Sequence, residues 1–177
     1  HIQSVKFYAD GALGSRGACL LHSYSDDTTS GLMLIDKNSF SISCQKAFDA
    51  GFQVATHAIG DSAMRLVLDV YGEILKTNNN RRWRIEHSQV VSPNDISKFK
   101  QFSIVPVINS THATSDMFWA IHRLGPDRIK TAYAYLELLK QNGWIANGSD
   151  FPVESINPLY GFYAAVARKN LKGEPKN

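Results

Sequence analysis

The feature that most constrains the fold is a regular alternation of strand-like and helix-like segments along the 177 residues. Short apolar, β-branched runs are each followed by a longer segment with apolar residues three and four positions apart, about five times over. This pattern predicts an α/β fold with parallel strands joined by helical crossovers. Both an open doubly wound sheet and part of a β/α barrel fit it. The predicted strands cover residues 4–8, 52–57, 83–87, 103–108 and 144–146.

The clearest unit is the strand at 52–57 with the helix that follows it. The strand ends on His57, the chain turns at Gly60, and Asp61 is the expected N-cap of the helix. The helix has one apolar stripe, made of Ala63, Leu66, Val67, Val70, Tyr71, Ile74 and Leu75. Because α/β enzymes place chemical groups at the carboxyl ends of their strands, His57 is the first candidate for chemistry.

Capping residues predict the other helices. Residues 39–50 form one helix, and Ser92 caps another with proline at its first position. Asp127 caps a further helix, which Gly143 ends, and Asn157 caps the last.

Composition excludes several classes of protein. With 44% hydrophobic and 20% charged residues the chain is globular, and its length makes one domain the default. The net charge of +3 comes from scattered lysines and arginines, so no nucleic-acid partner is expected. No run is long enough to span a bilayer, so no membrane role is expected either. Only Cys19 and Cys44 are present, which excludes a disulfide framework and favours a cytoplasmic location.

Four side chains within or beyond the predicted strands are suited to chemistry: Lys6, His57, His87 and Asp150. Strand ends of one polarity lie on one face of a parallel sheet, so these groups can meet. Two imidazoles, a carboxylate and a lysine amine able to form a carbamate are donors for zinc or a similar divalent ion. The metal would lower the pKa of a bound water to about 7, and Asp150 would take or relay its proton.

Each of these residues also has a simpler structural interpretation. A single histidine after a strand is more often a hydrogen-bonded structural residue, and Lys6 alone would be a solvated lysine. Asp150 fits a turn-forming aspartate, and His112 lies in a polar loop where substrate contact and solvation are equally consistent. An unrelated α/β ligand-binding domain would follow if the strand-end residues pointed to different faces.

Five spaced motifs make the chain similar to the metal-dependent amidohydrolase superfamily. The resemblance is to its branch called amidohydrolase family 3, which includes N-substituted formamide deformylases. The motifs occur in the family's order and cover nearly the whole chain, and they are Lys6–Arg16, His57–Asp61, Arg84–His87, Thr111–Met117 and Gly148–Glu154.

The resemblance implies roles for five residues. Lys6 matches the lysine of the fourth strand, often carbamylated and bridging two metals, and His57 and His87 match the metal ligands of the fifth and sixth strands. Asp150 matches the aspartate of the eighth strand, which binds metal and serves as general base. His112 matches a loop histidine that faces substrate. The implied cofactor is a divalent metal, zinc, with one or two ions in the full-length family.

Two departures from the family pattern shape the fold that we expect. The family's first strand supplies a His-x-His pair, which these residues lack, and Asn109-Ser110 stands where the family has Gln-Pro. A full barrel takes about 250 residues. Residues 1–177 are therefore expected to form one partial TIM-type β/α barrel domain of a metal-dependent hydrolase. It would hold about five βα units, corresponding to strands 4 to 8, as a fragment of a full barrel.

The expected function is metal-dependent hydrolysis of a non-peptide C–N bond in a small amide-like molecule. The alternative is a catalytically incompetent fragment or assembly subunit that lacks the His-x-His ligands. Five strands cannot close a barrel, and open sheet edges promote pairing with other chains. We therefore expect a homo-oligomer or a complex with a complementing N-terminal fragment.

Overall fold

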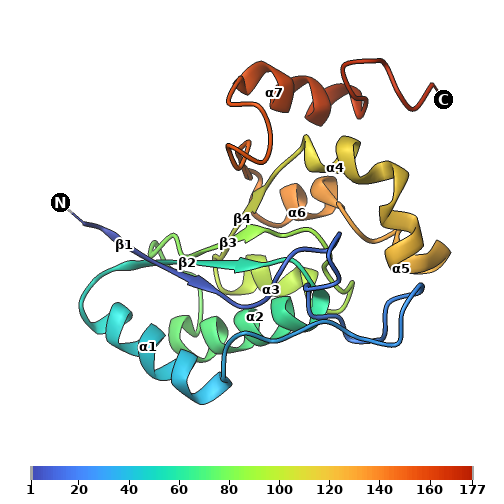
Figure 1. The fold of residues 1–177 in the computed structure, drawn as a ribbon. Coiled ribbons are helices and arrows are strands. Elements are labelled where there is room, and N and C mark those ends of the chain that lie inside the picture. The colour runs from blue at the N-terminus through green and yellow to red at the C-terminus, as the bar shows by residue number, and fades with distance from the viewer. Residues whose placement is uncertain (1, 177) are drawn as a thin grey trace.

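The computed structural model describes residues 2–176 and is built on one parallel sheet (Figure 1). Its five strands follow the order β1-β2-β3-β4-β5. They are β1 Ser4–Tyr8, β2 Gln53–Ala58, β3 Arg84–His87, β4 Val105–Ile108 and β5 Ala146–Asn147. A doubly wound sheet reverses its strand order, and this one does not. The prediction of an α/β fold with parallel strands is confirmed, and the doubly wound alternative is wrong.

Four helices form a layer on one face of the sheet. They are α1 Lys37–Asp49, α2 Asp61–Leu75, α3 Ile96–Gln101 and α6 Tyr135–Asn142. Helix α2 packs between α1 and α3, and α3 packs against α6, so the layer follows the strand order (Figure 1). Consecutive βα units that cross over with the same hand produce this one-sided layer.

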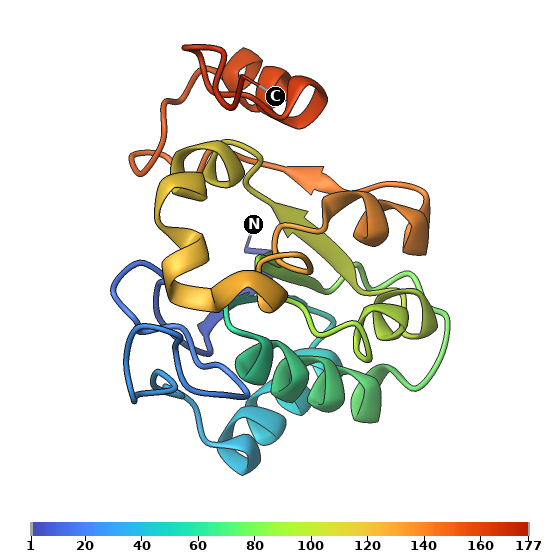
Figure 2. The ribbon, with the colours of Figure 1, turned by 90° about the vertical axis from the view of Figure 1, so that its right-hand side faces the viewer.

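The remaining helices lie beyond the ends of β4 and β5. They are α4 His112–Ser115, the 3₁₀ turn η1 Asp116–Phe118, α5 Ala120–Arg128 and α7 Pro158–Ala167. Figure 2 shows α7 as the outermost element, above α4. Within residues 2–176, every helix is too short or too polar to cross a membrane.

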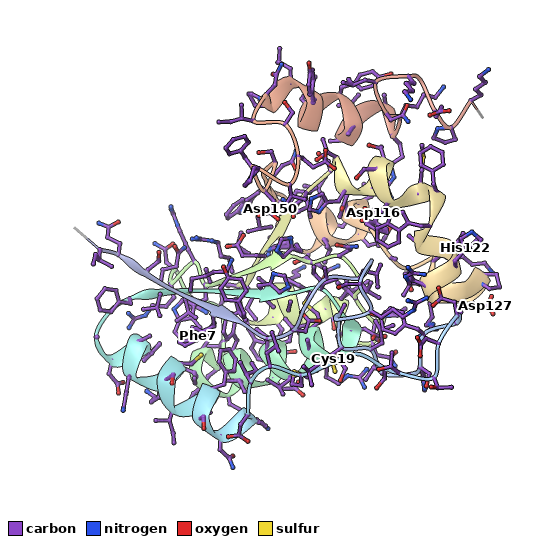
Figure 3. The ribbon with its side chains drawn as sticks, viewed as in Figure 1. Phe7, Cys19, Asp116, His122, Asp127 and Asp150 are labelled. Carbon is purple, nitrogen blue, oxygen red and sulfur yellow. The ribbon has the colours of Figure 1, made fainter. Side chains whose placement is uncertain are left out.

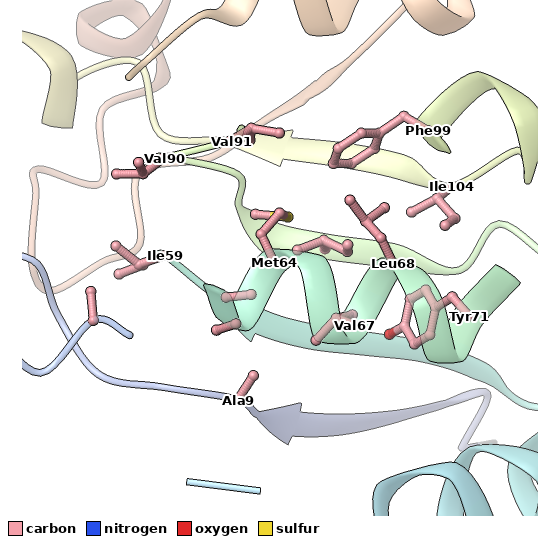
Figure 4. Packing of buried hydrophobic residues seen from close by; sticks show 14 of the residues in the cluster. Ala9, Ile59, Met64, Val67, Leu68, Tyr71, Val90, Val91, Phe99 and Ile104 are labelled. Atoms are coloured by element: carbon pink, nitrogen blue, oxygen red, sulfur yellow. The ribbon is translucent and has the colours of Figure 1, made fainter. Parts of the chain in front are cut away.

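The core lies between the sheet and α2 (Figure 4). Val54 and Ile85 point from the strands into this layer and are fully buried. The Thr56 hydroxyl lies 2.7 Å from the Tyr71 hydroxyl and ties the centre of β2 to the helix. The predicted stripe of α2 is therefore the buried face except at Leu66, which is only partly buried, and the face is widened by Met64, Leu68 and Gly72.

The opposite face of β1 and β3 carries polar or exposed side chains. Lys6 and Tyr8 are exposed on β1, and Tyr8 keeps 58% of its surface accessible. On β3, Arg84 donates to Glu86 at 2.5 Å, so these two side chains satisfy each other on that face. The two faces of the same strands therefore have different environments.

Two predicted caps are wrong at α2 and α3. Gly60 is the N-cap of α2, and the Asp61 carboxylate accepts a hydrogen bond from the Leu21 amide at 2.9 Å. Helix α3 begins at Ile96 rather than just after Ser92, because residues 93–95 form a turn. The Asp95 carboxylate in this turn binds Arg65 at 2.8 Å and Lys98 at 2.8 Å.

The predictions for the last helices have mixed outcomes. Asp127 lies inside α5, beyond a break at Gly125, and caps no helix. Helix α6 starts only at Tyr135 and ends at Gly143, whose positive φ of 74° supports the prediction of a glycine stop. The Asn157 side chain accepts a hydrogen bond from the Leu159 amide at 3.0 Å, which confirms the cap of α7.

Candidate metal centre

A cavity of about 260 Å³ opens at the carboxyl ends of the strands. Histidine and carboxylate side chains from strands β2 and β3 and from the segments after β4 and β5 line it, namely His57, His87, His112, Asp116, Asp150 and Glu154. Figure 3 shows Asp150 and Asp116 on the side of the sheet away from α1 and α2. Candidate residues far apart in the sequence therefore share one cavity.

His57 lies near the end of β2, opposite Tyr8 in the register. Its ring centroid lies 5.5 Å from that of Tyr8, and its Nε2 atom lies 3.5 Å from the Gly11 carbonyl oxygen. Burial lowers the pKa of His57, and the Lys6 ammonium lowers it further. A neutral imidazole is the form that binds a metal ion.

Asp10 fixes the turn that follows His57, and sequence reasoning missed it. Its buried carboxylate accepts hydrogen bonds from the amides of Ile59 at 3.0 Å, Gly60 at 2.8 Å and Cys19 at 2.9 Å. Burial raises the pKa of Asp10 to about 6. A Cβ atom on Gly60 would lie 2.1 Å from the Cys19 carbonyl oxygen, so this contact requires glycine.

His87 ends β3 with a positive φ of 74°. Strict alternation would direct its side chain to the helix layer with Ile85, and the left-handed conformation instead lets it line the cavity. Its ring centroid lies 4.5 Å from that of His57. Burial and the His57 imidazole lower the pKa of His87 to about 4, so both rings are neutral at pH 7.

Asn109 orients the His87 ring. The His87 Nδ1 atom lies 2.8 Å from the Asn109 Oδ1 atom, and the Asn109 Nδ2 group donates to the Gly148 carbonyl at 3.0 Å. An amide oxygen only accepts, so Nδ1 carries the proton and Nε2 keeps a free lone pair. Histidines that bind metals typically donate their other ring N–H group to an oxygen acceptor in this way. Asn109, noted above only as a departure from the family pattern, therefore links β4 with the segment that leads to Asp150.

His112 is the first residue of α4 and is buried, whereas the sequence predicted a polar loop. Its ring lies 6.2 Å from that of His87 and nearly parallel to it, at 11°. Its Nε2 atom has no hydrogen-bond partner among residues 2–176. A buried polar atom of this kind is costly unless something binds it, so this nitrogen is available to a ligand in the cavity.

Asp116 and Arg16 lie in two of the motifs that resemble the amidohydrolase family, and both have partners in the structure. Asp116 accepts from the Tyr133 hydroxyl at 2.8 Å, and burial raises its pKa. Arg16 pairs with Asp26 at 3.0 Å, and Arg123 of α5 pairs with the same carboxylate. The long loop after β1 is thereby tied to α5 beside the cavity.

Lys6 lies beside the cavity rather than in its lining. Its Nζ atom is 5.0 Å from the centre of the Tyr8 ring. Within residues 2–176, no three His, Cys, Asp or Glu side chains are arranged closely enough to hold a metal ion. The imidazoles of His57 and His87 and the carboxylate of Asp150 are donor types that zinc binds, but they are not placed closely enough in the described residues to hold an ion together.

A parallel sheet that collects imidazoles and carboxylates at its strand ends is the arrangement found in metal-dependent hydrolases of the α/β class. The sequence pattern of the Amidohydrolase family matches residues 1–176. The chain belongs to this family.

Two curated relatives are similar to nearly the whole chain. Protein LONG AFTER FAR-RED 3 of Arabidopsis thaliana is 37% identical over 172 residues, which are 95% of this chain and 30% of that protein. The protein YtcJ of Bacillus subtilis is 39% identical over 168 residues, which are 94% of this chain and 32% of that protein. The chain thus spans roughly a third of the length of these relatives.

Two solved structures, both described as uncharacterized metal-dependent hydrolases, share the fold. The one from Pyrococcus horikoshii OT3 has a TM-score of 0.84 at 33% identity and is matched over 94% of this chain and 33% of its own. The one from Pyrococcus furiosus has a TM-score of 0.80 at 33% identity and is matched over 93% of this chain and 34% of its own.

Proposed function

We propose that the chain is part of a metal-dependent hydrolase that cleaves a non-peptide C–N bond in a small amide, such as an N-substituted formamide. The observation that carries the proposal is the pair of neutral imidazoles, His57 and His87, whose ring centroids are 4.5 Å apart in a cavity that Asp150 also lines. Similarity to two metal-dependent hydrolases supports it.

Each residue has a role in this proposal. His57 and His87 would bind a divalent metal, zinc, through ring nitrogens, and the Asp150 carboxylate would complete their side of the site. A bound zinc ion supplies a water whose pKa falls to about 7. Asp150 would accept a proton from such a water, and the free His112 Nε2 atom would bind the amide of the substrate. The exposed Lys6 amine is open to carbamylation, which would make it a further oxygen donor.

The test is a calorimetric zinc titration of the purified chain and three variants. We expect His87→Ala and Asp150→Ala to weaken zinc binding at least tenfold. His122→Ala is the matched control, because His122 lies outside the cavity (Figure 3). Equal affinity in all of these proteins would contradict the proposed site.

We also propose that the chain is strands 4 to 8 of a TIM-type β/α barrel and associates with a complementing N-terminal segment or a second copy of itself. Helix α7 supports this, because Leu159, Phe162 and Val166 expose 68%, 67% and 72% of their surfaces. Large exposed apolar patches mark interaction sites. A stable monomer in light scattering at high concentration would count against self-association.

A second function is favoured by the placement of the candidate ligands, because no three His, Cys, Asp or Glu side chains of residues 2–176 are arranged to hold a metal ion. This function is a catalytically incompetent subunit that keeps the fold without the chemistry. The two functions differ in a mixing experiment with an N-terminal polypeptide that carries a His-x-His pair. The hydrolase proposal predicts that mixing raises zinc affinity and produces formate from an N-substituted formamide. The incompetent subunit would bind its partner and give neither result. The cytoplasmic location and the identity of the metal stay predictions.

A further inference from the structure

A second cavity of about 290 Å³ lies between α4 and α7. Its lining includes Thr111 and Ser115 from the α4 region, Tyr163 from α7, Glu154 from the loop before α7, and Lys169 and Lys172 from the segment after it. None of the proposed metal ligands lines it.

The two cavities share a wall. Ser115 and Glu154 line both of them, and the Ser115 hydroxyl donates to the Glu154 carboxylate at 2.7 Å. This hydrogen-bonded pair therefore lies where the space beside His112 adjoins the space beneath α7.

The second cavity is apolar with a cationic end. Phe118 and Tyr163 provide aromatic walls, and Lys169 and Lys172 approach from the segment after α7. Neither lysine forms an ion pair with a carboxylate of residues 2–176. The Thr111 hydroxyl is buried and has no hydrogen-bond partner in the same part of the chain. The Glu154 carboxylate lines both cavities, whereas Lys169 and Lys172 line only the second one, so the carboxylate is nearer to the histidines than the lysines are.

We infer that this cavity is a substrate subsite that binds an aromatic or aliphatic substituent ending in a carboxylate. The inference rests on the proposed function, because the substituent belongs to the amide that His112 would bind. The carboxylate lies against the two lysines, the Thr111 hydroxyl binds a polar atom of the ligand, and the amide passes the Ser115–Glu154 contact. The volume is at the small end of ligand pockets and suits one ring with a short acidic chain.

The experiment compares three probes by calorimetry and ligand-observed NMR on the whole chain. 3-Phenylpropionate carries the ring and the acid, 3-phenylpropan-1-ol lacks the charge, and 3-(4-formamidophenyl)propionate adds the amide opposite the acid. We expect 3-phenylpropionate to bind more tightly than the alcohol, and the formamide to bind most tightly. Replacing both lysines, Lys169→Ala with Lys172→Ala, weakens both acids roughly fivefold.

Three further variants separate the contacts. Thr111→Val keeps the shape and weakens both acids roughly threefold. His112→Ala weakens only the formamide-bearing acid. Lys46→Ala removes an exposed lysine of α1 outside both cavities, so the affinity for all three probes stays unchanged. Thermal unfolding of each variant shows whether its fold is retained.

Two results would overturn the subsite. Equal affinity for the acid and the alcohol would contradict a cationic end of the cavity. The same would follow if the double lysine variant bound all three probes as tightly as Lys46→Ala does. A zinc titration of the lysine variants keeps this test apart from that of the proposed function. Unchanged zinc binding with weakened binding of both acids supports the subsite, and unchanged binding of both acids overturns it whatever His87→Ala does to zinc binding.

Discussion

Helices α2 and α7 are both rich in apolar residues, yet only one of them buries those residues. In α2, Val67 and Leu68 are fully buried between the sheet and the neighbouring helices. In α7, Phe162 and Val166 expose about two thirds of their surfaces or more, at 67% and 72%. The cause is position, because α2 has neighbours on both sides and α7 follows β5, a two-residue strand at the edge of the sheet. An apolar face therefore indicates that a helix packs against another surface, and the elements beside the helix determine which surface that is.

The largest effect on the free energy of unfolding is expected from truncating one leucine in each of the two helices. Leu68→Ala in α2 leaves a cavity in the core and should lower the free energy of unfolding by about 2–5 kcal/mol. Leu159→Ala in α7, where 68% of the side chain is exposed, should change it by less than about 0.5 kcal/mol. Urea denaturation measures both. Similar losses in the two variants would mean that α7 packs as tightly as α2.

The next effect concerns the turn between β2 and α2. Gly60→Ala places a Cβ atom 2.1 Å from the Cys19 carbonyl oxygen, and relieving this clash should cost about 1–3 kcal/mol of stability. Gly148→Ala, just after β5, is the control, since the atom nearest to its added Cβ is the Asn109 Nδ2 atom at 4.0 Å. Equal stability of the two variants would show that the loop after β1 yields easily and does not fix His57.

A smaller effect is expected at Asn109, which joins the well-packed part of the sheet to the segment before α7. Asn109→Ala leaves the His87 Nδ1 group without its acceptor and should weaken zinc binding roughly 10- to 100-fold. Asn109→Asp keeps an acceptor oxygen and should retain most of the affinity. Calorimetric titration of the three proteins checks this. Loss of affinity in Asn109→Asp as large as in Asn109→Ala would assign the effect to the Gly148 contact instead.

The smallest effect on the monomer, within about 0.5 kcal/mol, is expected from charging the exposed face of α7. Phe162→Glu together with Val166→Glu should leave the free energy of unfolding nearly unchanged, since both side chains are exposed. The same change should raise the dissociation constant of any complex that covers α7. Sedimentation velocity compares the variant with the wild-type chain, and unchanged association would place the interface on another surface.

The sequence predicted the elements better than the contacts between them. Residues 4–8 and the glycine stop at Gly143 follow from local patterns, and the structure has both. Ser92 and Asp127 were wrong as caps because cap patterns consider neighbours in sequence only. Asp95 instead serves ion pairs with distant residues, including Arg65.

The parts of the site that the sequence did not reveal depend on long-range partners. Asp10 binds the Gly60 amide 50 positions along the chain, and Asn109 binds His87 across 22 positions. No spacing rule identifies such pairs. His57, His87 and Asp150 could be proposed earlier because each lies near a strand end, where the fold alone brings residues together. The exposure of α7 could not be predicted, since a pattern does not say whether a neighbour is present.

An NMR experiment on the ring nitrogens of the six histidines, as zinc is added to the chain, tests the proposed metal centre most directly. We expect the Nε2 signal of His87 and a ring-nitrogen signal of His57 to move together to the shifts of metal-bound imidazole, while the signals of His22 and His122 stay unchanged. If saturating zinc instead shifted only the signals of His22 or His122, or shifted no histidine signal, the proposed metal centre would be contradicted.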